Sequence, residues 1–177
     1  MRRRLTLTAV GLLCASAAVL PAANAATAAP QPTLPSLFAR QIAAINRAPQ
    51  APPVLLPRSM PLDVPRRFAT GGLSGGQGHG YDLAIGAVKH CGGANACFVA
   101  DFTAATGGKV FGKRVTVPGA TRAGFLPLSC GASCSPPQID FVWHGVLFTI
   151  QANLKTKQTD RTALIAAAQS AISAGPR

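Results

Sequence analysis

The stretch "QIDFVWHGVLFTIQ", residues 138–151, decides the fold of this chain. Apolar and polar residues alternate on both sides of His144-Gly145, and a glycine supplies the positive φ that a two-residue type I′ turn needs. With this turn in place, three apolar pairs fall on one face of a hairpin: Trp143 with Val146, Phe141 with Phe148, and Ile139 with Ile150. A slip of one residue would turn all six away from that face, so the stretch predicts a β-hairpin with one side toward the core.

Further strand patterns lie upstream of this hairpin. Residues 81–87 alternate in character, and residues 96–104 have the pattern of a hairpin partner that is reached across a cysteine-containing turn. Shorter strand-like runs follow at 110–117 and 123–128. Because short connections join antiparallel neighbours, these runs and the hairpin predict one antiparallel sheet.

The chain closes with a helix over about residues 160–174. Leu164, Ala167 and Ala171 fall on its apolar stripe, Thr159 or Asp160 can cap its start, and a glycine follows its end. Small residues in the stripe let a helix approach a sheet closely. The predicted fold class is therefore α+β, a twisted antiparallel sheet with the C-terminal helix packed on one face.

The first half of the chain is rich in proline, alanine and glycine. We expect residues 26–50 to form a Pro/Ala-rich tail with a short helix within 35–47, and residues 51–177 to form the domain. The stretch 53–61, "PVLLPRSMP", predicts a short edge strand that opens the domain. The glycine-rich stretch 71–80 is expected to be a flexible loop.

The N-terminus has the three parts of a secretory signal peptide. Three arginines at positions 2–4 precede the apolar stretch 5–20, and Ala23-Asn24-Ala25 supplies a small-residue cleavage site. We therefore expect residues 1–25 to be a signal peptide that is cleaved near Ala25. The mature chain is then secreted or extracytoplasmic, and no second apolar stretch predicts a transmembrane span in it.

Four cysteines follow the predicted signal peptide: Cys91, Cys97, Cys130 and Cys134. An even number in an exported chain predicts two disulfides, and three pairings are open on paper. We favour Cys91–Cys97 and Cys130–Cys134, because each pair encloses a short glycine-containing loop. The alternative is a zinc site formed by the four cysteines, or by cysteines with His90, although the spacings fit zinc poorly and an exported location favours oxidation.

Two stretches have the letters of nucleotide-binding motifs. Residues 73–77 spell an ABC-type signature, and residues 107–114 differ from a phosphate loop by one residue. Both motifs must lead into a helix, whereas strand patterns follow them here. The same test excludes the nucleophile-elbow spelling at 72–76. The sequence therefore predicts neither a nucleotide-hydrolysing protein nor a cofactor-binding one.

Basic residues dominate the charge, with seventeen Lys and Arg against five acidic residues, all of them aspartate. They are scattered and form no long run, so two readings stay open: a solvated surface, or a partner that is an anionic envelope polymer, peptide or protein. Nucleic acid is not expected at an exported address. The candidate anion-binding residues are Lys109, Lys113, Arg114, Arg122, Lys155, Lys157 and Arg161.

The few aspartates offer little for catalysis. Strand periodicity places Asp82 and Asp140 on the solvent side of their strands, and it places Asp101 on one face with Cys97 and Val99. A single aspartate is not a mechanism, so no catalytic residue is assigned.

The C-terminal half resembles a known family. "GKRVTV" (112–117), "GFLPL" (124–128), "IDFVWHGVLFTIQANL" (139–154) and "ALIAAAQSAI" (163–172) are similar to the small extracytoplasmic domain of unknown function found in bacterial anti-sigma factors and sporulation lipoproteins. The resemblance covers about residues 50–177. It implies a sheet that opens with a proline-punctuated strand, followed by a Trp hairpin and a final helix. It carries over no catalytic residue, and the corresponding positions are Trp143, Phe148, Ile150, Leu164 and Ile165.

From these patterns we expect a secreted, non-enzymatic binding or sensor-like module at the cell envelope, without a cofactor. Two other functions stay open. One is a small secreted hydrolase that uses Asp101 with His79 or His90, which requires these side chains to meet in one pocket. The other is a carrier of an apolar ligand such as a lipid, which requires an apolar cavity between the sheet and the helix.

Overall fold

A computed structural model describes residues 33–62, 64, 67–75, 79–91 and 96–177. The helices are α1 (Leu34–Leu37), α2 (Ala39–Ile45) and α3 (Asp160–Ala174). The strands are β1 (Phe68–Ser74), β2 (Gly80–Gly86), β3 (Phe98–Thr106), β4 (Lys113–Arg114), β5 (Arg122–Leu126), β6 (Ser129–Cys130), β7 (Cys134–Ser135), β8 (Gln138–Trp143) and β9 (Val146–Ala152). The predicted signal peptide, residues 1–25, lies outside the described residues.

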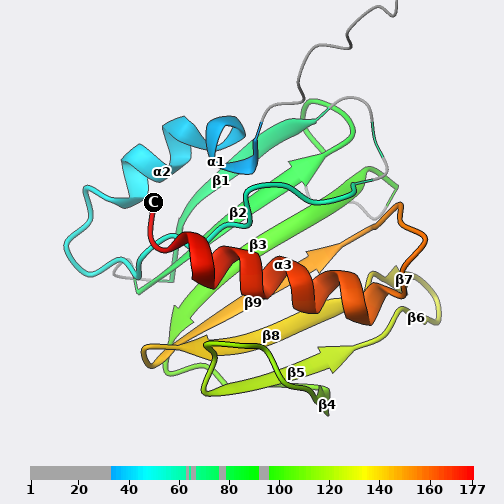
Figure 1. Cartoon of the computed structure of the whole chain (residues 1–177). Helices are drawn as coiled ribbons and strands as arrows, with labels where there is room; N and C mark the ends of the chain where they lie inside the picture. The colour runs from blue at the N-terminus through cyan, green and yellow to red at the C-terminus, as the bar shows by residue number, and fades with distance from the viewer. Residues whose placement is uncertain (1–32, 63, 65–66, 76–78, 92–95) are drawn as a thin grey trace, which may run out of the picture. The chain divides into compact units, whose positions relative to one another are not determined.

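Seven of the strands form one antiparallel sheet in the order β1-β2-β3-β9-β8-β5-β4, and β6 pairs with β7 in a separate small hairpin. Helix α3 crosses one face of the seven-stranded sheet (Figure 1). The predicted α+β class, with an antiparallel sheet and a C-terminal helix, is confirmed. Among the described residues, no helix combines the length and the apolar composition needed to cross a bilayer.

The hairpin of β8 and β9 forms in the predicted register. Trp143 pairs with Val146, and the two further predicted pairs, Phe141 with Phe148 and Ile139 with Ile150, follow. His144 and Gly145 both have positive φ, 48° and 80°, as a type I′ turn requires. The rings of Phe141 and Phe148 stack with their centroids 5.5 Å apart.

The predicted edge strand at 53–61 does not form. This extended, proline-bracketed segment packs on the sheet face, with Val54, Leu55 and Leu56 buried. The Leu55 N–H donates to the Tyr81 hydroxyl at 3.1 Å, and burial raises the pKa of this hydroxyl, which therefore stays protonated. Among the described residues of this part of the chain, Leu62 alone makes an isolated bridge, to Leu154. Prolines explain the difference, because they remove the donors that strand pairing needs.

Three other boundaries differ from expectation. The strand-like run at 110–117 contains only the two-residue strand β4. The run at 123–128 contributes β5, which begins at Arg122 and ends at Leu126. The stretch 71–80, expected to be a loop, holds the end of β1 and the start of β2, while residues 76–78 lie outside the described residues. Glycine therefore lies inside strands here as well as between them.

Residues 33–50, the described part of the expected tail, belong to the same compact unit as the sheet. They are therefore part of the domain and not a tail. The helix expected within 35–47 is present as α1 and α2. The Thr33 hydroxyl caps α1 by accepting from the Ser36 N–H. Phe38 is fully buried, and its ring meets that of Phe102 edge-on at 6.0 Å. Packing, rather than composition, ties this segment to the domain.

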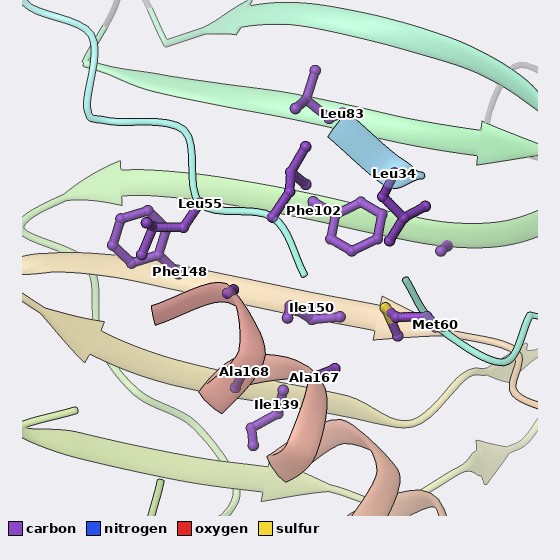
Figure 2. Close-up of a cluster of buried hydrophobic side chains, with 14 of the residues drawn as sticks. Leu34, Leu55, Met60, Leu83, Phe102, Ile139, Phe148, Ile150, Ala167 and Ala168 are labelled. Atoms are coloured by element: carbon purple, nitrogen blue, oxygen red, sulfur yellow. The ribbon is translucent and has the colours of Figure 1, made fainter. Parts of the chain in front are cut away.

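The main core lies on the face that α1, α2, the 51–62 segment and α3 cover. Figure 2 shows side chains from these sources meeting the sheet, among them Leu34, Leu55, Met60, Phe102, Ile139, Phe148, Ile150, Ala167 and Ala168. Ala167 and Ala168 are buried, and their small size brings α3 close to the strands. Thr159 caps α3 by accepting from the Thr162 N–H, as predicted.

Candidate functional site

The second face of the sheet is polar where the first is apolar. Alternate residues of the central strands point to this second face. The register of the strands places these residues in two rows that run across the sheet. One row runs through Thr70, Ala84, Asp101, Gln151 and Gln138. The other runs through Gly72, Asp82, Thr103, Thr149 and Asp140. Three of the five aspartates of the chain therefore share one face.

Part of this face is covered by the segment 107–112. Asp140 holds the segment, because its carboxylate accepts hydrogen bonds from the Phe111 N–H at 2.9 Å and from Thr149 Oγ1 at 2.8 Å. Gln138 Nε2 donates to the same carboxylate at 2.7 Å. A Cβ at Gly124 would collide with the Phe111 carbonyl, so glycine is needed beneath the segment. Asp140 is 1% exposed, and the expectation that it is solvated is wrong.

The rest of the face, over β1, β2 and β3, is hollowed by a cavity of about 450 Å³, here called the Asp pocket. Its carboxylates are Asp82, which is exposed, and Asp101, which is partly buried. The two aspartates share the lining with Phe68, Thr70, Phe98 and Gln151, among other residues.

A β-bulge determines which side chains join Asp101. Ile85 pairs with Ala100 but Gly86 pairs with Phe98, which leaves Val99 as an extra residue in β3. Val99 is therefore buried in the core, while Phe98 turns to the Asp pocket beside Asp101. The expected grouping of Asp101 with Val99 is wrong, because simple alternation does not pass through a bulge.

Asp101 is the electrostatically unusual group of the Asp pocket. Burial, and then the negative charge of Asp82, raise the pKa of its carboxyl to about 7. Its Oδ1 atom is buried and has no hydrogen-bond partner among the described residues. The carboxyl group is therefore half ionised near neutral pH, and a hydrogen bond with the Asp82 side chain also favours its protonated form.

Both predicted disulfides are present, Cys91–Cys97 and Cys130–Cys134. The alternative of a four-cysteine zinc site is therefore wrong, and the described residues hold no other group of three or more potential metal ligands. Cys91 lines the Asp pocket. Ser135 and Pro136, which directly follow Cys134, line it as well. Each disulfide thus adjoins a wall of the same cavity.

The residues predicted for other roles lie elsewhere. All seven candidate anion-binding side chains are exposed and none lines the Asp pocket: Lys109, Lys113, Arg114, Arg122, Lys155, Lys157 and Arg161. Lys109 Nζ lies 5.9 Å from the centroid of the Phe111 ring. His79 and His90 are exposed and do not line the pocket of Asp101. His90 lines a neighbouring groove with Arg40 and Arg67, and this groove shares Phe68 and Thr70 with the Asp pocket.

The sequence patterns did not predict that the carboxyl groups of Asp82 and Asp101 lie close together on one face of the sheet. Both residues lie in strands that the alternation pattern predicts, and these strands pair with Ala84 opposite Asp101. An explicit register for these strands would have placed the two carboxylates on one face. The pattern of the Asp pocket is also unusual for the chain, since the described lining holds two aspartates and no Lys or Arg in a protein of net charge +12.

Comparison with protein-family models, curated proteins and solved structures finds no match to this chain. The resemblance to the extracytoplasmic domain thus stays an expectation. What the Asp pocket binds has to be inferred from its own residues.

Proposed function

We propose that this protein is an exported binding module whose Asp pocket binds a positively charged amine or guanidinium group. The observation that carries the proposal is the Asp101 carboxyl, partly buried beside Asp82 with one oxygen unpartnered among the described residues. A buried carboxylate without a partner is costly, and a bound cation removes that cost by pairing with it.

The walls of the Asp pocket suit such a group. Phe68 and Phe98 are half-buried aromatic side chains on the same side of the sheet as the aspartates. An aromatic ring attracts a cation over its face, and it also packs against the carbons next to the charged nitrogen. Gln151, directly opposite Asp101 in β9, adds a polar side chain that can accept from an N–H.

The basic character of the chain makes the acidic pocket informative. The chain has seventeen basic and five acidic residues, and the described lining of the Asp pocket has two aspartates and no Lys or Arg, so the local charge is opposite to the net charge. A cation that approaches this protein is repelled by the overall charge, so it must be held by local attraction from Asp82 and Asp101. Export is supported by the predicted signal peptide and by two disulfides, which persist in oxidising compartments.

A second candidate function follows from the same carboxylates. An aspartic acid with a pKa near 7 beside a second aspartate is the arrangement that hydrolases use for a general acid and its partner. Asp101 then protonates a leaving group, and Asp82 is the second carboxyl group of the pair. This version of hydrolysis replaces the histidines with Asp82, because neither histidine lines the Asp pocket.

The test is calorimetric titration of the mature protein with n-butylamine at pH 6 and pH 8. Because the ammonium group prefers ionised Asp101, affinity should be about tenfold lower at pH 6 than at pH 8, following the ionised fraction of a group with a pKa near 7. Asp101→Asn should abolish this pH dependence and weaken binding at pH 8. Gln169→Lys makes the same one-unit change in net charge at an exposed position that lines neither cavity, and it should change neither.

Absence of n-butylamine and guanidinium binding, or an unchanged affinity in Asp101→Asn, would contradict the proposal. Turnover of chromogenic glycosides or esters that disappears in both Asp101→Asn and Asp82→Asn would favour the hydrolase instead. Residual turnover in both variants would exclude the carboxylate pair as its source.

A further inference from the structure

A second hollow adjoins the Asp pocket. Its volume is about 360 Å³, and apolar side chains dominate its described lining. They include Phe98, Val99, Leu128, Pro137 and Leu154. We call it the apolar hollow.

Two features place the apolar hollow next to the Asp pocket. Phe98 lines both cavities, so one residue forms part of each wall. Pro136 lines the Asp pocket and the next residue, Pro137, lines the apolar hollow. A ligand held at Asp101 therefore has an apolar surface within reach past the Phe98 ring.

Leu128 is the most exposed apolar side chain named in the lining of the apolar hollow. It is 55% exposed, one of four large apolar side chains that the described structure leaves in solvent to about this extent. A leucine in solvent is common by itself, but this one lies at the edge of an apolar concave surface. A bound alkyl or aryl group would remove both the Leu128 side chain and this apolar surface from water.

The apolar hollow is itself a poor second site for a cation. Its one acidic side chain among the described lining, Asp160, lies in the first turn of α3, where the helix N-terminus already compensates a negative charge. Arg161 follows directly and adds a positive charge. The strongest attraction for a cation thus remains at Asp82 and Asp101.

We infer that the ligand is an amphipathic amine, with its charged nitrogen at Asp101 and an apolar chain that passes Phe98 into the apolar hollow beside Leu128 and Leu154. This inference rests on the proposed function, because it specifies what is attached to the cation. It selects alkylamines and arylalkylamines over small hydrophilic amines, and chain length becomes the determinant of affinity.

The experiment is titration of the mature protein with the n-alkylamines from ethylamine to octylamine at pH 8. Once the chain reaches the apolar hollow, each added methylene should tighten binding about three- to fourfold. Leu128→Ser should flatten this dependence and leave ethylamine binding unchanged. Leu73→Ser is the matched control, since Leu73 is 48% exposed on β1 and lines neither cavity.

The failures of the two proposals differ. Ethylamine binding that depends on Asp101, with no gain from longer chains, would overturn the amphipathic ligand and leave the cation site standing. Equal binding of octylamine and octanol would overturn both, because the charged nitrogen would contribute nothing. Linear diamines that bind more tightly than alkylamines of equal length, and lose this advantage in Asp160→Asn, would show a second cation site in place of the apolar chain.

Discussion

Consecutive residues of β3 meet opposite surroundings. Phe102 points into the core, where it is 1% exposed and contacts the Phe38 ring. Asp101 points to the other face, where one carboxylate oxygen is buried without a partner among the described residues. The same strand thus gains stability on one side and carries an electrostatic cost on the other.

The two faces are also closed by different means. Helices and the 51–62 segment cover the core face, and apolar packing holds them there. The polar face is covered only in part, by the 107–112 segment, which the hydrogen bond between the Phe111 N–H and Asp140 helps to hold. Disulfide loops flank the part that stays open. Packing therefore stabilises the fold, while polar contacts and cross-links shape the Asp pocket.

The largest difference between the faces should come from neighbouring substitutions in β3. Phe102→Ala removes a buried ring and should lower the free energy of unfolding by about 3–5 kcal/mol. Thr103→Ala, at the next residue and on the polar face, should cost under about 1 kcal/mol. Urea unfolding measures both. Similar losses would mean that the polar face also contributes to the core.

An intermediate effect is expected from the disulfide beside the Asp pocket. Replacing Cys91 and Cys97 together by serine releases a short loop, and the loop-entropy relation predicts a loss of about 2 kcal/mol. It should also weaken n-butylamine binding, since Cys91 lines the pocket. Unfolding and titration of the double variant test both. If the double variant loses about 2 kcal/mol of stability but binds n-butylamine with unchanged affinity, the disulfide stabilises the fold without shaping the Asp pocket.

The remaining prediction concerns the dependence of stability on pH. The pKa of Asp101 is about 7 in the folded protein, against an ordinary value of 3.8 that applies to the unfolded chain, so the folded protein binds more protons between these values. Its stability should fall as pH rises from about 4 to about 7. Asp101→Asn should remove this fall, and should match the wild type at about pH 4 and exceed it at about pH 8.

Urea midpoints at pH 4, 6 and 8 measure this difference, with Gln169→Lys, at an exposed position of α3, as the control for the same change in net charge. A variant that is less stable than the wild type at pH 8 would show that the Asp101 carboxylate has a stabilising partner. In that case the cost assigned to the polar face would be wrong.

The sequence predicts those parts of the fold that local periodicity encodes. The β8–β9 register follows from a turn and three apolar pairs, and α3 follows from its stripe and its cap at Thr159. The 53–61 segment resembles a strand in sequence because a buried extended segment and an edge strand have the same pattern of leucines and prolines. Only packing against Tyr81 distinguishes them.

The site is harder to predict because it depends on relations between strands. Asp101 stands out in the sequence, but the bulge at Val99 places Phe98, and not Val99, on the same face as Asp101. Periodicity makes Asp140 a solvated residue because the segment that buries it lies about thirty residues away in the chain. Charge composition directs attention to Lys and Arg, while the unusual feature is a cavity whose described lining lacks them.

The 107–112 segment has a consequence for how specificity could change. It covers the polar face above Asp140 and leaves the Asp pocket open, so its length determines how much of the sheet is accessible. Lengthening a surface segment carries a small entropic cost, which grows only with the logarithm of its length. Insertions next to Gly107 are therefore a route by which a library of variants could narrow the pocket for smaller ligands without altering the strands that hold the carboxylates.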